Sequence, residues 1–304
     1  MTLLEEIQSM KEEKDVLILA HYYTTGDIQS IADAVGDSYL LSKKAAESEA
    51  KTILFCGVEF MGESAVILSP EKQVLMPDLS ADCPMAHMVT PEDVQKMREE
   101  HPEAAVVCYI NSTAEIKACA DVCVTSSNAE RVVRGLPQEA VYFIPDANLG
   151  RHIAERIPEK KFYFHDGYCP IHATITPERV AETKAAHPGA KVLMHPECVE
   201  AALEMADYIG STSGIIDFPE KDGGEEYIIA TEEGVLYELN RRYPDKHFYM
   251  AVDHCICHDM KKNTLEKVYE VLKSLDQPVK MQEEMRLKAE HSLKEMHRLA
   301  SLEA

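Results

Sequence analysis

The chain has 304 residues, of which 45% are hydrophobic and 28% are charged. This length leaves room for one large domain or two to three small ones, and the composition is that of an ordinary soluble globular protein. The formal net charge of −22 argues against a nucleic acid or an anionic membrane surface as a partner.

The chain shows no export signal, and no apolar run approaches the roughly 20 residues needed to span a bilayer. Its nine cysteines are an odd count without the spacing of a disulfide framework. Free cysteines are typical of a reducing compartment. We therefore expect a cytoplasmic protein.

Apolar strands recur along the chain at a nearly fixed interval. The first predicted strand of each unit begins near Val16, Ala104 and Ala190, which are 88 and then 86 residues apart (104 − 16, 190 − 104). A second strand recurs at the same intervals near Ile53, Val141 and Tyr227. Such self-similarity is the sequence signature of a repeat architecture.

Helical patterns separate these strands, at Ile28–Val35, Tyr39–Ser48, Ala129–Arg134, Leu149–Arg156, Pro196–Met205 and Glu232–Arg242. Strands that alternate with short helices indicate βαβ units and parallel sheets. The sequence therefore predicts three similar three-layer α/β repeats, over residues 14–100, 101–187 and 188–276, arranged about a pseudo-threefold axis with the site at its centre.

Terminal helices are predicted over residues 1–13 and within 277–304. The Met- and Leu-rich segment Lys280–Leu302 has the pattern of an amphipathic helix packed on one repeat. Its predicted core-facing residues are Met285, Ala289, Leu293 and Met296.

A third strand in each repeat leads into a polar turn that contains a cysteine. These residues are Cys83, Cys169 and Cys257, which are 86 and 88 residues apart. Pro170 follows the second of them, at what is predicted to be the first turn of a helix. Free N–H groups and the helix dipole at such a junction are expected to lower the thiol pKa and favour the thiolate, which is the form that binds metal.

Polar side chains recur where the first strands end. They are His21 with Tyr23, Tyr109 with Asn111, and His195 with Glu197, and a hydroxyl recurs as Ser38, Ser126 and Thr212. Ligands of open α/β sheets bind beyond the carboxyl ends of the strands. A pseudo-threefold arrangement would bring these side chains and the three cysteines to one central cavity.

Three thiolates drawn from distant points fit structural zinc poorly, because zinc usually takes four ligands at short local spacings. Iron–sulfur clusters are held by thiolates. A cubane cluster with three protein ligands leaves one iron open, and this iron can act as a Lewis acid on a substrate.

Several motifs in the chain resemble the quinolinate synthase family, over roughly Val16–Val271. They are ILAHYYTTGDIQSIADAVGDSYLLSKKA, CPMA, YINSTAEIKA, VTSSNA, GYCPIHA, HPEC, GSTSG, IIATEEG and CHDMKKNTLEKV. The resemblance implies three α/β repeats and one [4Fe–4S] cluster per chain on three cysteines. It also implies condensation of iminoaspartate with dihydroxyacetone phosphate to quinolinate, with release of phosphate and water, in de novo NAD biosynthesis.

The same resemblance assigns the site residues. The cluster ligands are Cys83, Cys169 and Cys257, with Cys257 rather than Cys255 in the ligand position. The substrate-binding positions are His21, Ser38, Tyr109, Ile110, Asn111, Ser126, His195, Pro196, Glu197 and Thr212. The catalytic residues are Tyr23, Tyr109, His195 and Glu197.

The expected roles follow from this assignment. The hydroxyls, Asn111 and backbone N–H groups at helix N-termini would hold the carboxylates and phosphate of two anionic substrates. His195 and Glu197 would form an acid–base pair, and Tyr23 with Tyr109 would relay protons. The open iron would bind substrate and draw off a hydroxyl group. The family further implies supply of iminoaspartate by an aspartate oxidase or dehydrogenase, and we expect a monomer.

The sequence also allows other interpretations. A hydro-lyase could use the same open cluster on a hydroxy acid, and a redox sensor could form a disulfide between Cys119 and Cys123 or between Cys255 and Cys257. Ser126 and Thr212 could merely cap helices. The remaining cysteines, Cys56, Cys108, Cys119, Cys123 and Cys198, are interpreted as core residues, with Cys255 left undecided.

Overall fold

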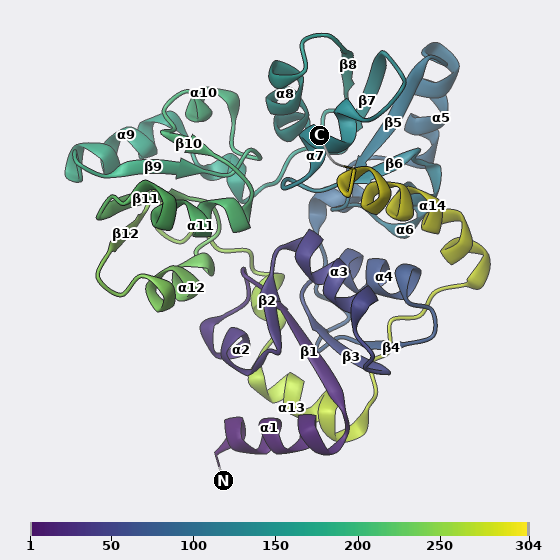
Figure 1. Cartoon of the computed structure of the whole chain (residues 1–304), viewed down its shortest axis with the longest axis vertical. Helices are drawn as coiled ribbons and strands as arrows, with labels where there is room; N and C mark the ends of the chain where they lie inside the picture. Colours follow the sequence, from purple (N-terminus) through teal and green to yellow (C-terminus); the bar gives the residue numbers. More distant parts are fainter. Residues whose placement is uncertain (1, 303–304) are drawn as a thin grey trace.

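The computed structural model describes residues 2–302 and contains three four-stranded sheets in that range, all parallel. Figure 1 shows one lobe per sheet, with the three lobes around a common centre. The strands are β1 (Val16–His21), β2 (Ala34–Gly36), β3 (Thr52–Cys56), β4 (Gln73–Leu75), β5 (Ala104–Tyr109), β6 (Val122–Val124), β7 (Ala140–Ile144), β8 (Lys161–Phe164), β9 (Lys191–Met194), β10 (Tyr208–Ile209), β11 (Glu226–Ala230) and β12 (His247–Met250).

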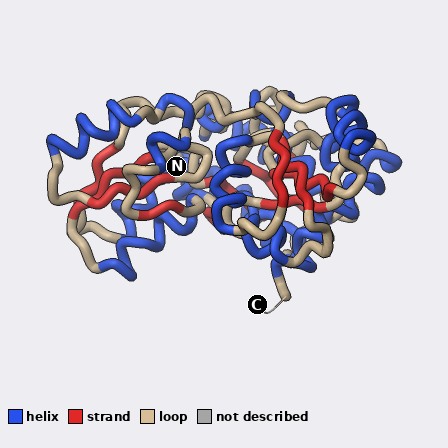
Figure 2. Tube along the Cα trace, turned by 90° about the horizontal axis from the view of Figure 1, so that it is seen from above, coloured by secondary structure: helices blue, strands red, loops and turns tan. Residues whose placement is uncertain are grey.

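Helices separate the strands and cover the sheets on both faces, as Figure 2 shows. The α-helices are α1 (Leu3–Glu13), α2 (Gly26–Ile31), α3 (Ser38–Glu47), α4 (Glu59–Leu68), α5 (Pro91–Glu100), α6 (Ala114–Cys119), α7 (Ala129–Arg134), α8 (Ala147–Arg156), α9 (Pro177–Ala186), α10 (Glu200–Leu203), α11 (Thr212–Asp222), α12 (Val235–Arg242), α13 (Leu265–Ser274) and α14 (Glu283–Ala300). Short 3-10 turns follow the last strand of each sheet, as η1 (Pro84–His87), η2 (His172–Thr174) and η3 (Met260–Lys262). The predicted α/β class with parallel sheets is confirmed.

The three sheets share one strand order, which is β2-β1-β3-β4 in the first lobe, β6-β5-β7-β8 in the second and β10-β9-β11-β12 in the third. The two strands predicted first in each repeat form the centre of each sheet. Both faces of these central strands are covered, so their residues are almost all buried. Repeat-equivalent aspartates Asp33, Asp121 and Asp207 each accept the N–H of a central-strand residue, at 2.8, 2.7 and 2.8 Å.

One edge strand in each sheet was not predicted. The predicted helix over Ile28–Val35 is wrong in its second part, because α2 ends at Ile31 and Ala34–Gly36 pairs with β1. A strand of two or three residues is too short to show the period-two alternation of a half-buried strand. The predicted helices Pro196–Met205 and Glu232–Arg242 also begin later, at Glu200 and Val235.

A helix that precedes each sheet in the chain packs against that lobe. α1 packs on β1, α5 on α6 and α9 on β11, and α13 then packs on α1 in the first lobe. α1, α5 and α9 each carry a basic side chain that forms an ion pair with the repeated aspartate of its lobe. The pairs are Lys11–Asp33, Arg98–Asp121 and Lys184–Asp207. The division at 14–100, 101–187 and 188–276 remains a prediction.

The C-terminal helix α14 packs on α6 and β6 of the second lobe and reaches α4 of the first. Ala289, Leu293 and Met296 are fully buried and Met285 is half-buried, so the predicted core-facing side is confirmed. Within residues 2–302, no helix combines the length and apolar character that a membrane crossing requires.

Candidate active site

A cavity lies at the junction of the three lobes, beyond the carboxyl ends of the central strands. It encloses about 660 Å³ of empty space, including open solvent at its mouth. The predicted residues that line it are His21, Tyr23, Ser38, Cys83, Tyr109, Asn111, Cys169, Ser126, His195, Glu197, Thr212 and Cys257. Ile110 and Pro196 are buried but are not among the lining residues.

The three cysteines line the cavity from loops rather than from strand ends. Cys83 is the residue before η1, with Pro84 at the first position of that turn. Cys169 and Cys257 stand three residues before η2 and η3. Backbone N–H groups of the following turn point at each thiol and oppose the effect of burial on its pKa.

The expected lowering of the thiol pKa is wrong for these cysteines in the protein on its own. Burial raises the pKa of Cys83 and Cys169 well above the ordinary value and raises that of Cys257 to about 11. The 3-10 turns are only three to four residues long. Their dipole is therefore too small to outweigh desolvation.

Glu197 is the hub of the polar groups in the cavity. Its Oε2 lies 2.7 Å from Nδ1 of His172 and 3.6 Å from Nδ1 of His195. Burial alone would raise the pKa of Glu197, but the two histidines and a hydrogen bond from Tyr109 hold it below its ordinary value. Glu197 is therefore an ionised carboxylate in a cavity wall where it is only 3% exposed.

A chain of hydrogen bonds connects this carboxylate to Tyr23. Nε2 of His172 lies 2.9 Å from Oγ1 of Thr231, which in turn lies 2.7 Å from the Tyr23 hydroxyl. The Tyr23 hydroxyl also lies 3.0 Å from Oγ1 of Thr212. Burial raises the pKa of Tyr23 well above 10, so its hydroxyl keeps its proton at neutral pH. The arrangement can pass a proton between Tyr23 and Glu197 through groups already in contact.

The two predicted histidines are neutral bases. Burial lowers the pKa of His21 and of His195 to about 3. Nδ1 of His21 accepts the N–H of Tyr23 at 3.1 Å, and Nε2 of His195 lies 3.3 Å from the Ser126 hydroxyl. Nδ1 of His195 also accepts the Glu197 N–H, at 3.4 Å, so both nitrogens of His195 have neighbours.

Several polar atoms at the cavity are available to a ligand. The Asn111 Oδ1 atom is buried and has no partner among the described residues. Ser38 and Thr212 are the first residues of α3 and α11, where the side chains of Asp37 and Ser211 each accept one N–H and the other N–H groups of the first turn remain for a ligand. The capping interpretation is wrong for Thr212, because Ser211 caps α11, and for Ser126, because Asn128 occupies the N-cap of α7.

His172 and Thr231 are the site residues that the sequence analysis did not assign. Thr231 directly follows β11, so its place at the carboxyl end of a central strand was the available signal. His172 lies three residues after Cys169, and its Nδ1 is 3.2 Å from the Cys169 sulfur. One ligand atom each from Cys169, His172 and Glu197 lie within 4.8 Å of one another, a mixed set that zinc also accepts.

All nine cysteines fall within the described residues and are free thiols. The core interpretation holds for Cys56, Cys108, Cys123 and Cys198, which are buried, while Cys119 is half-buried. Cys255 is also buried, close to Cys198 in the third lobe.

The three lobes, with three thiols able to bind a metal beside buried groups able to exchange protons, are those of an α/β protein with a cavity suited to metal-assisted acid–base chemistry. A family model described as "Quinolinate synthetase A protein" matches residues 5–298. The quinolinate synthase of Clostridioides difficile (strain 630) is 49% identical over 295 residues, which cover 97% of each chain. That of Fusobacterium nucleatum is 48% identical over 296 residues, covering 97% of this chain and 99% of the relative.

A third relative, the quinolinate synthase of Clostridium perfringens (strain 13 / Type A), is 48% identical over 299 residues, covering 98% of this chain and 99% of its own. The chain belongs to the quinolinate synthase family, as its motifs predicted. The family serves NAD biosynthesis and is an iron–sulfur family.

Proposed function

We propose that the chain condenses iminoaspartate with dihydroxyacetone phosphate to quinolinate, and that Cys83, Cys169 and Cys257 hold one [4Fe–4S] cluster. The single observation that carries this proposal is the meeting of three thiols, one from each lobe, at one cavity. Those thiols lie close enough to affect one another's pKa. Cys257 adds to the rise in the pKa of Cys83, and Cys83 adds to the rise in the pKa of Cys169. The donor set therefore fits a cluster with three protein ligands.

When bound, such a cluster would supply Lewis acidity at its fourth iron. The protein's own residues would do the rest. Glu197, ionised and hydrogen-bonded to His172, is the base that accepts a proton from substrate carbon or nitrogen. Tyr23, linked to that pair through Thr231, is the acid that returns a proton to a departing oxygen.

The substrates would be held by neutral donors. The hydroxyls of Ser38, Ser126 and Thr212 lie at the cavity, and the first turns of α3 and α11 add the N–H groups that Asp37 and Ser211 leave unpaired. Hydrogen bonds from such donors to an anion are roughly twice as strong as those between neutral groups. We also propose that the enzyme works in the cytoplasm as a monomer, supplied with iminoaspartate by an aspartate oxidase or dehydrogenase.

The deciding experiment measures iron and acid-labile sulfide per chain in anaerobically purified protein and in the Cys83→Ser, Cys169→Ser and Cys257→Ser variants. We expect about four of each in the parent protein, as in a cubane cluster, and loss in all three variants. Cys255→Ser is the matched control and should keep its iron. Stoichiometric zinc without sulfide, from iron-replete cells, would overturn the cluster and favour zinc at the Cys169, His172 and Glu197 atoms.

The substrates are tested on the same preparation. Quinolinate should form only when both iminoaspartate and dihydroxyacetone phosphate are present. Turnover of a hydroxy acid without the triose phosphate would instead identify a hydro-lyase.

A further inference from the structure

Glu232 lines the cavity and forms a buried ion pair with Lys261 that has no part in the proposed chemistry. Glu232 directly follows Thr231 and is fully buried, and the Lys261 side chain is 19% exposed. Lys261 Nζ lies 2.8 Å from Glu232 Oε1. A buried pair of this kind rarely adds stability over an apolar one, so its presence calls for a specific role.

The two groups hold two parts of the site at once. Glu232 Oε1 accepts the backbone N–H of Cys257 at 3.0 Å, which fixes the start of that cysteine's loop. Lys261 Nζ donates to the backbone oxygen of Tyr23 at 2.7 Å. One ion pair therefore joins a cysteine loop of the third lobe to the tyrosine of the first.

The backbone around the pair is packed with little tolerance. Glu232 Oε2 accepts the N–H of Gly234 at 2.7 Å. A Cβ at Gly234 would lie 2.6 Å from the backbone oxygen of Tyr22 and 2.8 Å from the Cα of Tyr23. Only glycine therefore allows the two backbone segments to lie this close together. A shift of the 232–234 segment is thus transmitted directly to Tyr23.

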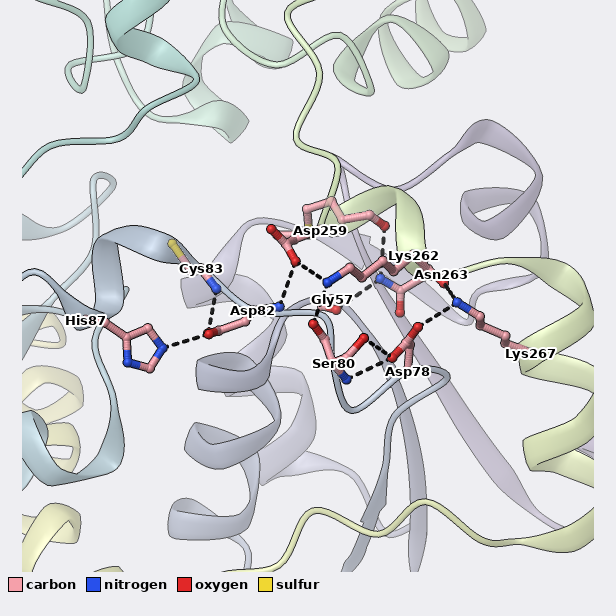
Figure 3. A network of polar contacts seen from close by, with 11 residues as sticks. Gly57, Asp78, Ser80, Asp82, Cys83, His87, Asp259, Lys262, Asn263 and Lys267 are labelled. Carbon is pink, nitrogen blue, oxygen red and sulfur yellow. Dashed lines mark hydrogen bonds and ion pairs between the residues drawn. The ribbon is translucent and has the colours of Figure 1, made fainter.

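The Cys83 loop is held by a carboxylate in the same way, as Figure 3 shows. Asp82 Oδ1 accepts the Cys83 N–H at 2.6 Å, and Asp82 Oδ2 lies 2.7 Å from His87 Nε2. The Asp82 N–H donates to Asp259 Oδ1 at 3.2 Å, and Lys262 pairs with that aspartate at 2.7 Å. The loops of Cys83 and Cys257 are therefore tied to each other as well as to their carboxylates.

We infer that Glu232 and Lys261 are positioning residues. They fix the Cys257 ligand loop of the third lobe relative to Tyr23 of the first lobe. The inference rests on the proposed function, since it assigns the ion pair to the metal ligand and the proton donor of that reaction. Lys261 acts through Tyr23, and Glu232 acts on both Tyr23 and Cys257. The two roles are separable by measurement.

The ligand arm is tested by iron release from anaerobic holoenzyme to a ferrous chelator, in Glu232→Ala and Glu232→Gln. The amide of Gln still offers an oxygen to the Cys257 N–H, so we expect several-fold faster release in the Ala variant and near-parent release in the Gln variant. Glu238→Ala is the matched control, because Glu238 is a buried, ion-paired glutamate of the same lobe, partnered by Arg241 and Arg242 and remote from the cavity. Equal release from Glu232→Ala and Glu238→Ala would overturn this arm.

The catalytic arm is tested by kinetics of Lys261→Met and Lys261→Arg. A misplacement of about 1 Å can reduce turnover by about 100-fold, so we expect kcat of Lys261→Met to fall at least tenfold with KM little changed, and Lys261→Arg to restore most of it. Since Lys261 acts through Tyr23, Lys261→Met should add less than about twofold to the defect of Tyr23→Phe. Full additivity of the two defects would refute the assignment.

The outcomes separate this inference from the proposed function. A parent protein without iron and sulfide, or without quinolinate formation, contradicts the proposed function. A parent protein that has both, with Lys261 and Glu232 variants that behave like Glu238→Ala, contradicts the positioning role alone. Gly234→Ala supplies an independent perturbation of the same contact and should reproduce the low kcat of Lys261→Met.

Discussion

Tyr23→Phe removes one oxygen atom from the proton path and leaves the ring in place. The Thr231 hydroxyl keeps its contact with His172 at 2.9 Å, but Thr212 loses its contact with Tyr23 at 3.0 Å. One buried hydroxyl without a partner lowers the free energy of unfolding by about 1–3 kcal/mol. Loss of a positioned proton donor lowers kcat by about 100- to 10,000-fold. The variant should therefore fold, keep its iron and turn over very slowly.

The assay is quinolinate formation under anaerobic conditions, with iron content and thermal unfolding measured on the same samples. Tyr22→Phe is the control, because Tyr22 is the neighbouring tyrosine, is buried in the third-lobe contact and does not line the cavity. We expect this control to keep kcat within a small factor of the parent. A Tyr23→Phe enzyme with kcat within about threefold of the parent, against the expected loss, would show that the path does not carry the proton.

Three further predictions follow from the same contacts. Glu197→Gln keeps the shape of the side chain but removes the base, so kcat should fall by about 100-fold or more while iron content is unchanged, as measured by turnover and iron assay. Burial lowers the folded pKa of His21 and His195 to about 3 from 6.5, so the unfolded chain binds more protons between these values and stability is lost as pH falls through that window. Urea unfolding of iron-free protein should show a loss of up to about 1.4 kcal/mol per pH unit for each histidine, and His21→Gln should reduce the slope. Leu293→Ala in α14 removes a fully buried side chain far from the cavity, and should lower the free energy of unfolding by about 2–5 kcal/mol in urea without changing kcat of the folded enzyme.

The repeat period carried most of what the sequence could predict. His21, Tyr109 and His195, which are 88 and 86 residues apart, lie at equivalent ends of equivalent strands, and the three cysteines, 86 and 88 apart, lie in equivalent loops, so the period alone predicts that they meet at one cavity. This reasoning fails where a residue has no equivalent in the other repeats. His172 and Thr231 have none with a polar side chain of the same kind, and their roles depend on contacts between lobes.

Local physics explains the other errors. The two- or three-residue edge strands lie below the length at which alternation is visible, as Ala34–Gly36 shows. The sequence predicted a lowered thiol pKa, whereas the pKa is raised. A strand-to-helix junction in the sequence indicates a helix dipole but gives no information about burial. Burial is the larger effect at Cys83, Cys169 and Cys257, and it depends on all three lobes together.

The charge of the cavity wall restricts how an anionic substrate can be held. Among the described residues, those that line the cavity include Asp37, Asp82, Glu197 and Glu232 but neither lysine nor arginine. Two of these carboxylates are matched by His172 and Lys261, and Asp37 is occupied by the Leu40 N–H and the Ser213 hydroxyl, at 2.9 and 2.6 Å. A site that neutralises its own carboxylates in this way leaves a ligand to be held by the cavity hydroxyls, the Asn111 amide and the N–H groups of α3 and α11 that Asp37 and Ser211 do not occupy. Recognition by directed donors fixes where each negative group lies, whereas a mobile lysine would supply charge with little direction. For the proposed condensation, which must align two anions for bond formation, directed donors are the better solution.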